Sequence, residues 1–243
     1  MSELLDAVVV GAGQAGLGIS YYLQRDGRKH VVFERGRIGE TWLSQRWDSF
    51  QLNTPNFMNA LPGLPYQGTE RDGFWRQDEL VAYYQGYVEH FRLPVRKGVR
   101  VISLEQAEDK SHFIVKARTE GQPEETVLCR SVVVAAGIQL VPKIPAFRNK
   151  IPENIAQLHT ASYRNPEAIP SGAVLLVGSG QSGCQICEPC PPAASFRSRA
   201  LRSYHQLAKL GSAGCHHPGS SARHRGEYSH PGRRGGRTCP SCG

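Results

Sequence analysis

Two glycine-rich hexapeptides contain the residues of this 243-residue chain whose types and spacing could do chemistry. They are GAGQAG at residues 11–16 and GSGQSG at residues 178–183, and each follows a short β-branched run. In a Gly-x-Gly-x-x-Gly fingerprint the first glycine permits a tight turn. The second lets backbone N–H groups approach a pyrophosphate, and the third allows close packing of helix on sheet. Two fingerprints predict two dinucleotide sites, which is typical of redox chemistry.

The first fingerprint has the sequence context that a dinucleotide site needs. Residues 6–10 predict a strand, the residues after the glycines predict a helix that ends at Gly27, and residues 31–33 predict a second strand. Glu34 stands at the end of that second strand, where a carboxylate binds ribose hydroxyls. Because a carboxylate would repel a 2′-phosphate, we expect FAD or NAD here rather than NADP. The expected contacts are Gly11, Gly13, Gln14, Ala15, Gly16 and Glu34.

The second fingerprint predicts a nicotinamide nucleotide site behind a strand at residues 173–177. The residue that would select NAD or NADP should lie about 20 residues further on, in a segment of different character, so this preference is not predicted. Prolines at 189, 191 and 192 limit the helix that follows. The expected contacts are Gly178, Gly180, Gln181, Ser182 and Gly183.

The segments between the fingerprints indicate the fold that must position them. Residues 36–75 predict a long ordered loop, residues 78–91 an amphipathic helix, and residues 99–104, 113–117 and 126–135 three strands. A connector covers residues 138–172. We therefore predict an α/β class, with a Rossmann-like FAD/NAD(P)-binding fold of parallel sheet and β-meander. The expected domains are an FAD-binding domain at 1–165, the start of an incomplete NAD(P)-binding domain at 166–187, and a tail at 188–243.

The tail differs from the rest of the chain in composition. Residues 187–243 hold nine of the 29 Lys and Arg but only two of the 21 Asp and Glu, and four Leu, Ile, Val or Phe in all. Such a basic Cys/Pro/Gly-rich segment cannot bury enough apolar surface to offset its ordering entropy, which predicts disorder. It has neither the fold nor the interleaved aromatic residues of a nucleic-acid binder.

Three origins of the tail are open at this point. Its CxxC pairs, Cys187 with Cys190 and Cys239 with Cys242, could bind zinc or, for the second pair, act as a redox dithiol. We favour an out-of-frame translation, because the hydrophobic periodicity stops inside an expected helix, and we expect no metal site. The chain has no run long enough for a membrane span and no signal pattern at its start, which favours a cytoplasmic protein without a membrane partner. Its oligomeric state is not predicted.

From residue 6 to about residue 186 the chain resembles class B flavin-containing monooxygenases, single-component enzymes that bind FAD and NADPH in two Rossmann-like domains. His159, Tyr163 and Arg164 fit the second half of the family motif Phe-x-Gly-x-x-x-His-x-x-x-Tyr/Phe-Lys/Arg, whereas Glu153 and Ile155 replace its first half. Tyr163, where Baeyer–Villiger relatives have Trp, indicates the N- or S-oxygenating branch. The resemblance is carried by GAGQAG (11–16), Glu34-Arg35, IGETW (38–42), RWDSFQLNTPNF (46–57), LPG (61–63), VVVAAG (132–137), LHTASYRNP (158–166) and VGSGQSG (177–183).

The resemblance implies an activity and further site residues. NADPH would reduce FAD, and the reduced flavin would activate O2, transferring one oxygen atom to a small-molecule amine or sulfide while the other leaves as water. Asn53 would face the flavin ring as the catalytic residue. Further cofactor contacts would come from Arg35, Thr41, Trp42, Trp47, Gly137 and His159.

Simpler structural roles remain open for these residues. They are core packing for the two Trp, a turn for Asn53, a connector hydrogen bond for His159, and a salt bridge rather than a phosphate contact for Arg46. Two other functions also remain open: an FAD-dependent disulfide or other pyridine-nucleotide reductase, and a fragment that only binds FAD.

Overall fold

The computed structural model describes residues 3–138 and 141–187, which lie within one structural unit. The predicted tail at 188–243, with its expected disorder and Cys190, Cys239 and Cys242 of the cysteine pairs, lies outside the described residues, whereas Cys187 is the last described residue. Within them the chain forms one six-stranded sheet in the order β3-β2-β1-β6-β5-β4. The strands are β1 (Leu4–Val10), β2 (His30–Glu34), β3 (Val95–Lys97), β4 (Val99–Gln106), β5 (Phe113–Thr119) and β6 (Glu125–Val134). Strands β3, β2, β1 and β6 run parallel, and β4–β5–β6 form an antiparallel meander.

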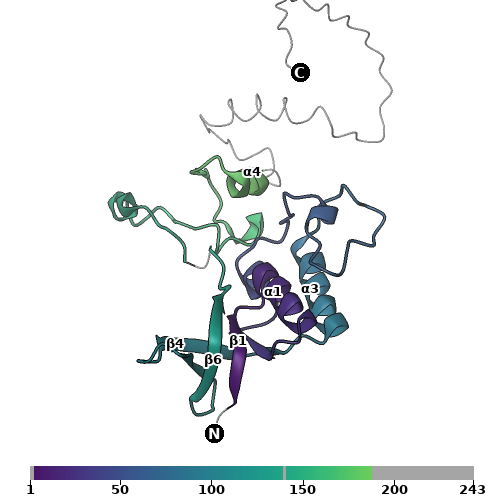
Figure 1. Ribbon diagram of the computed structural model, residues 1–243. Coiled ribbons are helices and arrows are strands. Elements are labelled where there is room, and N and C mark those ends of the chain that lie inside the picture. Colours follow the sequence, from purple (N-terminus) through teal and green to yellow (C-terminus); the bar gives the residue numbers. More distant parts are fainter. Residues whose placement is uncertain (1–2, 139–140, 188–243) are drawn as a thin grey trace, which may run out of the picture. The chain divides into compact units, whose positions relative to one another are not determined.

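Helices α1 (Gln14–Arg25) and α3 (Gln77–Phe91) lie beside each other on one side of the sheet (Figure 1). Residues of β1 alternate between two cores, as the period of a strand requires. Val9 packs with the two helices, whereas Val8 packs with the meander. Helix α1 ends at Arg25, two residues before the predicted Gly27, which terminates it with a φ of 68° while the N–H of Arg28 bonds back to Leu23 O at 2.8 Å.

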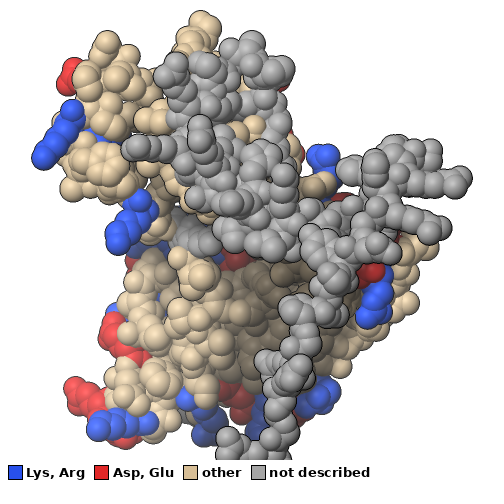
Figure 2. Space-filling view, turned by 90° about the horizontal axis from the view of Figure 1, so that it is seen from above, with Lys and Arg blue, Asp and Glu red and all other residues tan. Residues whose placement is uncertain are grey.

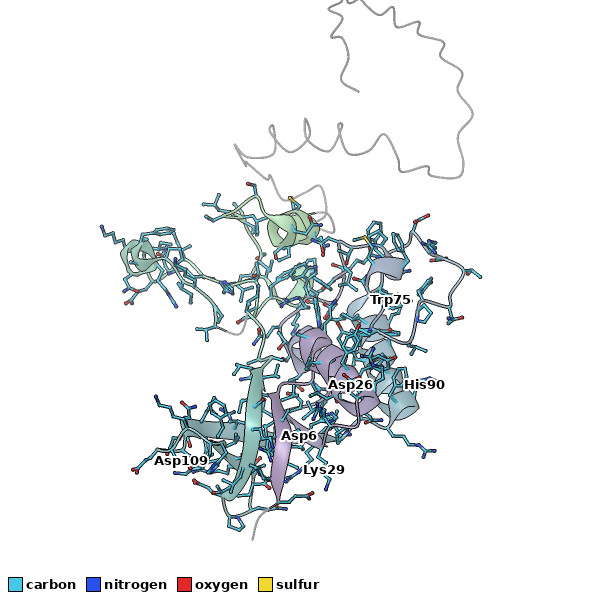
Figure 3. The ribbon with its side chains drawn as sticks, in the orientation of Figure 1. Asp6, Asp26, Lys29, Trp75, His90 and Asp109 are labelled. Atoms are coloured by element: carbon cyan, nitrogen blue, oxygen red, sulfur yellow. The ribbon has the colours of Figure 1, made fainter. Side chains whose placement is uncertain are left out.

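The start of the sheet is held in register by Asp6 and Lys29, which Figure 3 shows close together. The backbone N–H of Lys29 donates to the Asp6 carboxylate at 2.9 Å, and the Asp6 N–H donates to Lys29 O at 2.8 Å. These two bonds fix β2 against β1, so that both strands end at the edge where the first glycine turn lies.

The expected strands of the first domain and its long helix are confirmed, with ends shifted by a few residues at most. The loop predicted at 36–75 contains helix α2 (Glu40–Ser44) and the short 3-10 helix η1 (Asn56–Met58). The connector holds two further 3-10 turns, η2 (Ala146–Lys150) and η3 (Pro166–Ala168). Strand β3 was not predicted, because it has three residues, two of them charged.

The strand predicted at 173–177 is wrong, because these residues are not part of a sheet in the structure. Leu175 and Val177 are 75% and 74% exposed, while Val174 and Leu176 are partly buried. The alternation that typifies a strand is present, but among the described residues no neighbouring strand offers hydrogen bonds to it. Helix α4 (Gln181–Cys187) follows, and what comes after it lies outside the described residues.

Candidate functional site

The first glycine turn has the geometry of a phosphate cradle. Gly11 adopts a φ of 107°, and a Cβ there would lie 2.5 Å from the Ala135 carbonyl oxygen. A Cβ on Gly16 would lie 1.9 Å from the carbonyl oxygen of Gly11, whereas one on Gly13 would meet nothing within 4 Å. Gly11 and Gly16 therefore let the turn, the helix and the sheet approach one another closely. Gly13 leaves open space over the N-terminus of α1. No side chain caps this end of α1, so its N–H groups can bind an anion.

Glu34 lies against this turn at the end of β2. Its side chain is 8% exposed. One carboxylate oxygen accepts from the Ala12 N–H at 2.8 Å and the other from the Gly36 N–H at 2.9 Å. Each oxygen keeps a lone pair for a ribose hydroxyl. The predicted acid and the predicted turn thus form one site, and the neighbouring Arg35 is exposed beside it.

The end of β6 closes the other side of the turn. The Ala135 N–H donates to Val10 O at 2.8 Å, and the Ala135 carbonyl is the group that excludes a side chain at Gly11. Gly137 follows with a φ of 84° and open space around its Cα. The cofactor contact expected of Gly137 stays a prediction.

A cavity of about 420 Å³ opens between the loop after α2, the connector and α4. It brings together residues from distant parts of the sequence, which were predicted separately. Basic groups reach it from Arg46, Lys143 and His159, and none of its described lining residues is acidic. Six predicted site residues line it: Trp42, Trp47, Asn53, His159, Gln181 and Ser182. A neighbouring hollow of about 620 Å³ shares Asn53 and Gln181 with it.

The second glycine turn repeats part of the geometry of the first, but a Cβ on Gly178 would meet nothing within 4 Å, unlike one on Gly11. Gly178 has a φ of 112°, and a Cβ on Gly183 would lie 2.4 Å from the Gly178 carbonyl oxygen. A Cβ on Gly180 would meet nothing within 4 Å, as at Gly13. The turn therefore forms although the strand predicted before it does not. Helix α4 follows it with seven residues, so that Gln181 and Ser182 stand at its start.

A small apolar cluster holds helix α4 on the first domain. Ile186 packs with Trp47 and Tyr163, and their side chains are 6%, 2% and 3% exposed. The side-chain amide of Gln185 donates to Gln51 O at 2.9 Å. These contacts hold α4, which follows the second glycine turn, against the loop at residues 47–51 beside the cavity.

Arg164 was noted from the family motif, but its role was not predicted. Its guanidinium donates to the carbonyls of Leu43, Ser44 and Arg46, at the C-terminal end of α2. Its own carbonyl accepts from the Asp48 N–H at 2.8 Å. A cation in this place satisfies carbonyls that the five-residue helix leaves without donors. Arg164 thereby fixes the loop that carries Trp42 and Trp47.

His159 makes a hydrogen bond within the connector, the simpler structural role left open for it, and it also lines the cavity. Its Nδ1 accepts from the Ala161 N–H at 3.1 Å, so the neutral ring carries its proton on Nε2. The two interpretations of this residue are therefore compatible, and its cofactor role stays a prediction.

The surroundings of two charged groups in the loop shift their pKa values. Arg37 forms a two-pronged ion pair with Glu40, at 2.8 and 3.1 Å, and this pairing lowers the pKa of the Glu40 carboxyl to about 2. Burial lowers the pKa of Arg46, whose guanidinium stacks over the rings of Trp42 and Phe50 at 5.0 and 5.5 Å. The contacts of Arg46 thus include aromatic stacking and a bond to Gln45 O at 3.0 Å.

Three glutamines of the cavity were not predicted from the sequence. Gln45, Gln51 and Gln185 all line the cavity, but a single amide has no spacing that would single it out. The remaining predicted contacts lie at the first turn, where Gln14 and Ala15 begin α1, and in α2, where Thr41 is partly buried.

Features that would indicate other chemistry are not found in the described part of the chain. Between residues 3 and 187, without 139–140, no group of three or more His, Cys, Asp and Glu could hold a metal ion. None of the helices in these ranges has the length and apolarity to cross a membrane. On the visible described surface in Figure 2, basic and acidic side chains are interspersed.

Comparisons with known proteins match most of the described chain. A family model described as pyridine nucleotide-disulphide oxidoreductase matches residues 8–188. The uncharacterized oxidoreductase CzcO of Bacillus subtilis (strain 168) is 36% identical over 184 residues, covering 75% of this chain and 51% of that protein. The indole-3-pyruvate monooxygenase YUCCA1 of Oryza sativa subsp. japonica is 31% identical, covering 74% and 43%.

A solved structure gives the same correspondence in three dimensions. A flavin-containing monooxygenase from Stenotrophomonas maltophilia is 28% identical with a TM-score of 0.61, covering 76% of this chain and 54% of that one. The chain thus spans about half the length of the relatives that it matches.

Proposed function

Because the chain belongs to the pyridine nucleotide-disulphide oxidoreductase family and corresponds to the N-terminal part of a class B flavin monooxygenase, we propose that it is an FAD-dependent oxidoreductase of the monooxygenase type. One observation carries this proposal. The helix that follows the second glycine turn packs on the loop of the first domain, and residues expected at the reacting rings line the cavity of about 420 Å³ beside it.

FAD is the cofactor that suits the first turn. The open space at Gly13 admits a pyrophosphate to the N-terminus of α1, and Glu34 offers carboxylate lone pairs to a ribose. The second turn, with open space at Gly180, would take the pyrophosphate of NADPH by the same physical means. When bound, the flavin accepts a hydride from the nicotinamide and activates O2.

The side chains of the cavity would bind, orient and exclude water. Trp42 and Trp47 supply apolar walls, and basic Arg46 and Lys143 suit anionic cofactors. The amide of Asn53 is exposed at the point shared by both hollows, where it could donate to bound oxygen or orient a small amine or sulfide. A cytoplasmic location without nucleic-acid or membrane partners belongs to the same proposal.

The test is product formation by the full chain. Purified protein is loaded with FAD and given NADPH, O2 and methyl phenyl sulfide or a tertiary amine, and sulfoxide or N-oxide is measured. Asn53→Ala should lose product while it retains FAD. NADPH consumption that depends on an added disulfide, without oxygenated product, would instead identify a disulfide reductase.

A further inference from the structure

The indole N–H of Trp47 is a buried donor without an acceptor. The side chain is 2% exposed and lines the 420 Å³ cavity, and its Nε1 has no hydrogen-bond partner among the described residues. Buried donors are rarely left unpaired, because the loss of their bond to water is not recovered. This atom therefore points to an acceptor that the described part of the chain does not supply.

Two acceptors for which the described residues supply no donor line the same cavity. They are the side-chain carbonyl oxygens of Gln45, directly after α2, and of Gln185, on α4. The orientation of the Gln185 amide is fixed, because its nitrogen donates to Gln51 O at 2.9 Å. Its oxygen is consequently the end that is left for a ligand. The cavity thus offers one donor and two acceptors, which come from the loop after α2 and from α4.

We propose that these atoms bind the amide edge of a planar cofactor ring. The carbonyl oxygen of that amide edge would accept from Trp47, and its adjacent N–H would donate to Gln45 or Gln185. Both the pyrimidine edge of a flavin and the carboxamide of a nicotinamide present this chemistry. The aromatic walls of Trp42 and Phe50 suit a flat ring. This inference rests on the proposed function and assigns it positioning atoms that the fingerprints do not contain.

The experiment compares dinucleotides with fragments that lack the ring. FAD is paired with ADP, and NADP⁺ with 2′,5′-ADP, and binding to the full chain is measured by calorimetry. Trp47→Phe removes the indole N–H and keeps an aromatic ring, and Gln45→Met removes the carbonyl at similar length. Trp75→Phe is the control. Figure 3 labels Trp75 beside α3, where it packs on Tyr83 with ring centroids 5.0 Å apart, and it lines neither hollow.

We expect Trp47→Phe to weaken one dinucleotide about five- to tenfold, as for one lost buried hydrogen bond, with its ring-free fragment unchanged. Loss for FAD identifies the flavin edge, and loss for NADP⁺ the nicotinamide edge. Gln45→Met should weaken the same dinucleotide, and Trp75→Phe neither.

Two results would overturn the inference while the proposed function stands. In one, Trp47→Phe and Gln45→Met bind both dinucleotides as tightly as the parent, as expected if water alone fills the cavity. In the other, the ring-free fragments weaken equally, so that the effect is structural. If the parent binds neither dinucleotide, the proposed function itself fails, and the inference with it.

Discussion

Gly16→Ala tests whether the first glycine turn is as tight as its geometry indicates. The new Cβ would lie 1.9 Å from the Gly11 carbonyl oxygen, where ordinary contact begins near 3.4 Å. Forced overpacking of this kind costs about 3 kcal/mol. Because alanine is a better helix former than glycine by about 1 kcal/mol, the net loss of unfolding free energy should be about 2 kcal/mol. For a chain of this size that lowers the Tm by roughly 4–8 °C.

Gly13→Ala is the matched control, because its Cβ meets nothing within 4 Å and its φ of −92° suits alanine. This variant should lose no more than about 1 kcal/mol of stability, as an N-cap change. Its methyl group would instead occupy the space for the pyrophosphate, so FAD affinity should fall about tenfold, or about 1.4 kcal/mol. Thermal melting and FAD titration of both variants decide the matter. A Gly16→Ala protein that melts at or above the parent temperature would refute the close approach of helix and turn.

Three further changes test the surrounding structure. Tyr83→Phe removes a hydroxyl that accepts from a loop N–H at 2.7 Å and donates to a loop carbonyl at 2.8 Å. The free energy of unfolding should fall by about 2 kcal/mol. Tyr22→Phe, a change at an exposed side chain, should melt like the parent. Arg164→Met leaves three carbonyls at the C-terminal end of α2 without their donor. We expect the free energy of unfolding to fall by about 2 kcal/mol, and by less for Arg164→Lys. Equal stability of Arg164→Met and the parent would contradict the capping role. The pKa of Glu40 falls from 4.5 to about 2 on folding, so its pair with Arg37 stabilises the protein above pH 4.5 and stops doing so as the pH falls toward 2. The difference in unfolding free energy between the parent and Arg37→Gln should shrink over that range, and a constant difference would count against the pair.

Local patterns in the sequence predict the first domain well. The strand, turn, helix and strand up to Glu34 could be recognised because glycines at fixed spacing have a local steric reason. Helix α3 could be recognised by its apolar period and by acidic residues in its first turn.

The errors fall where structure depends on partners distant in the sequence. Strand β3 exists because it pairs with β2, and residues 173–177 lack such a neighbour among the described residues. Helix α2 is closed by Arg164, more than 100 residues away. Arg46 stacks on Trp42 and Phe50, a contact that charge alone does not predict, and the salt bridge expected for it stays a prediction. The cavity glutamines likewise gain meaning only once three segments meet.

The most direct test of the account is anaerobic reduction of the FAD-loaded full chain by NADPH. The two glycine turns, and the packing of α4 on the first domain, predict that the protein retains FAD and that NADPH bleaches the flavin absorbance without added disulfide. Admission of O2 should then restore the absorbance. A chain that holds FAD but whose absorbance NADPH leaves unchanged would contradict a working second site, and would identify a protein that only binds FAD.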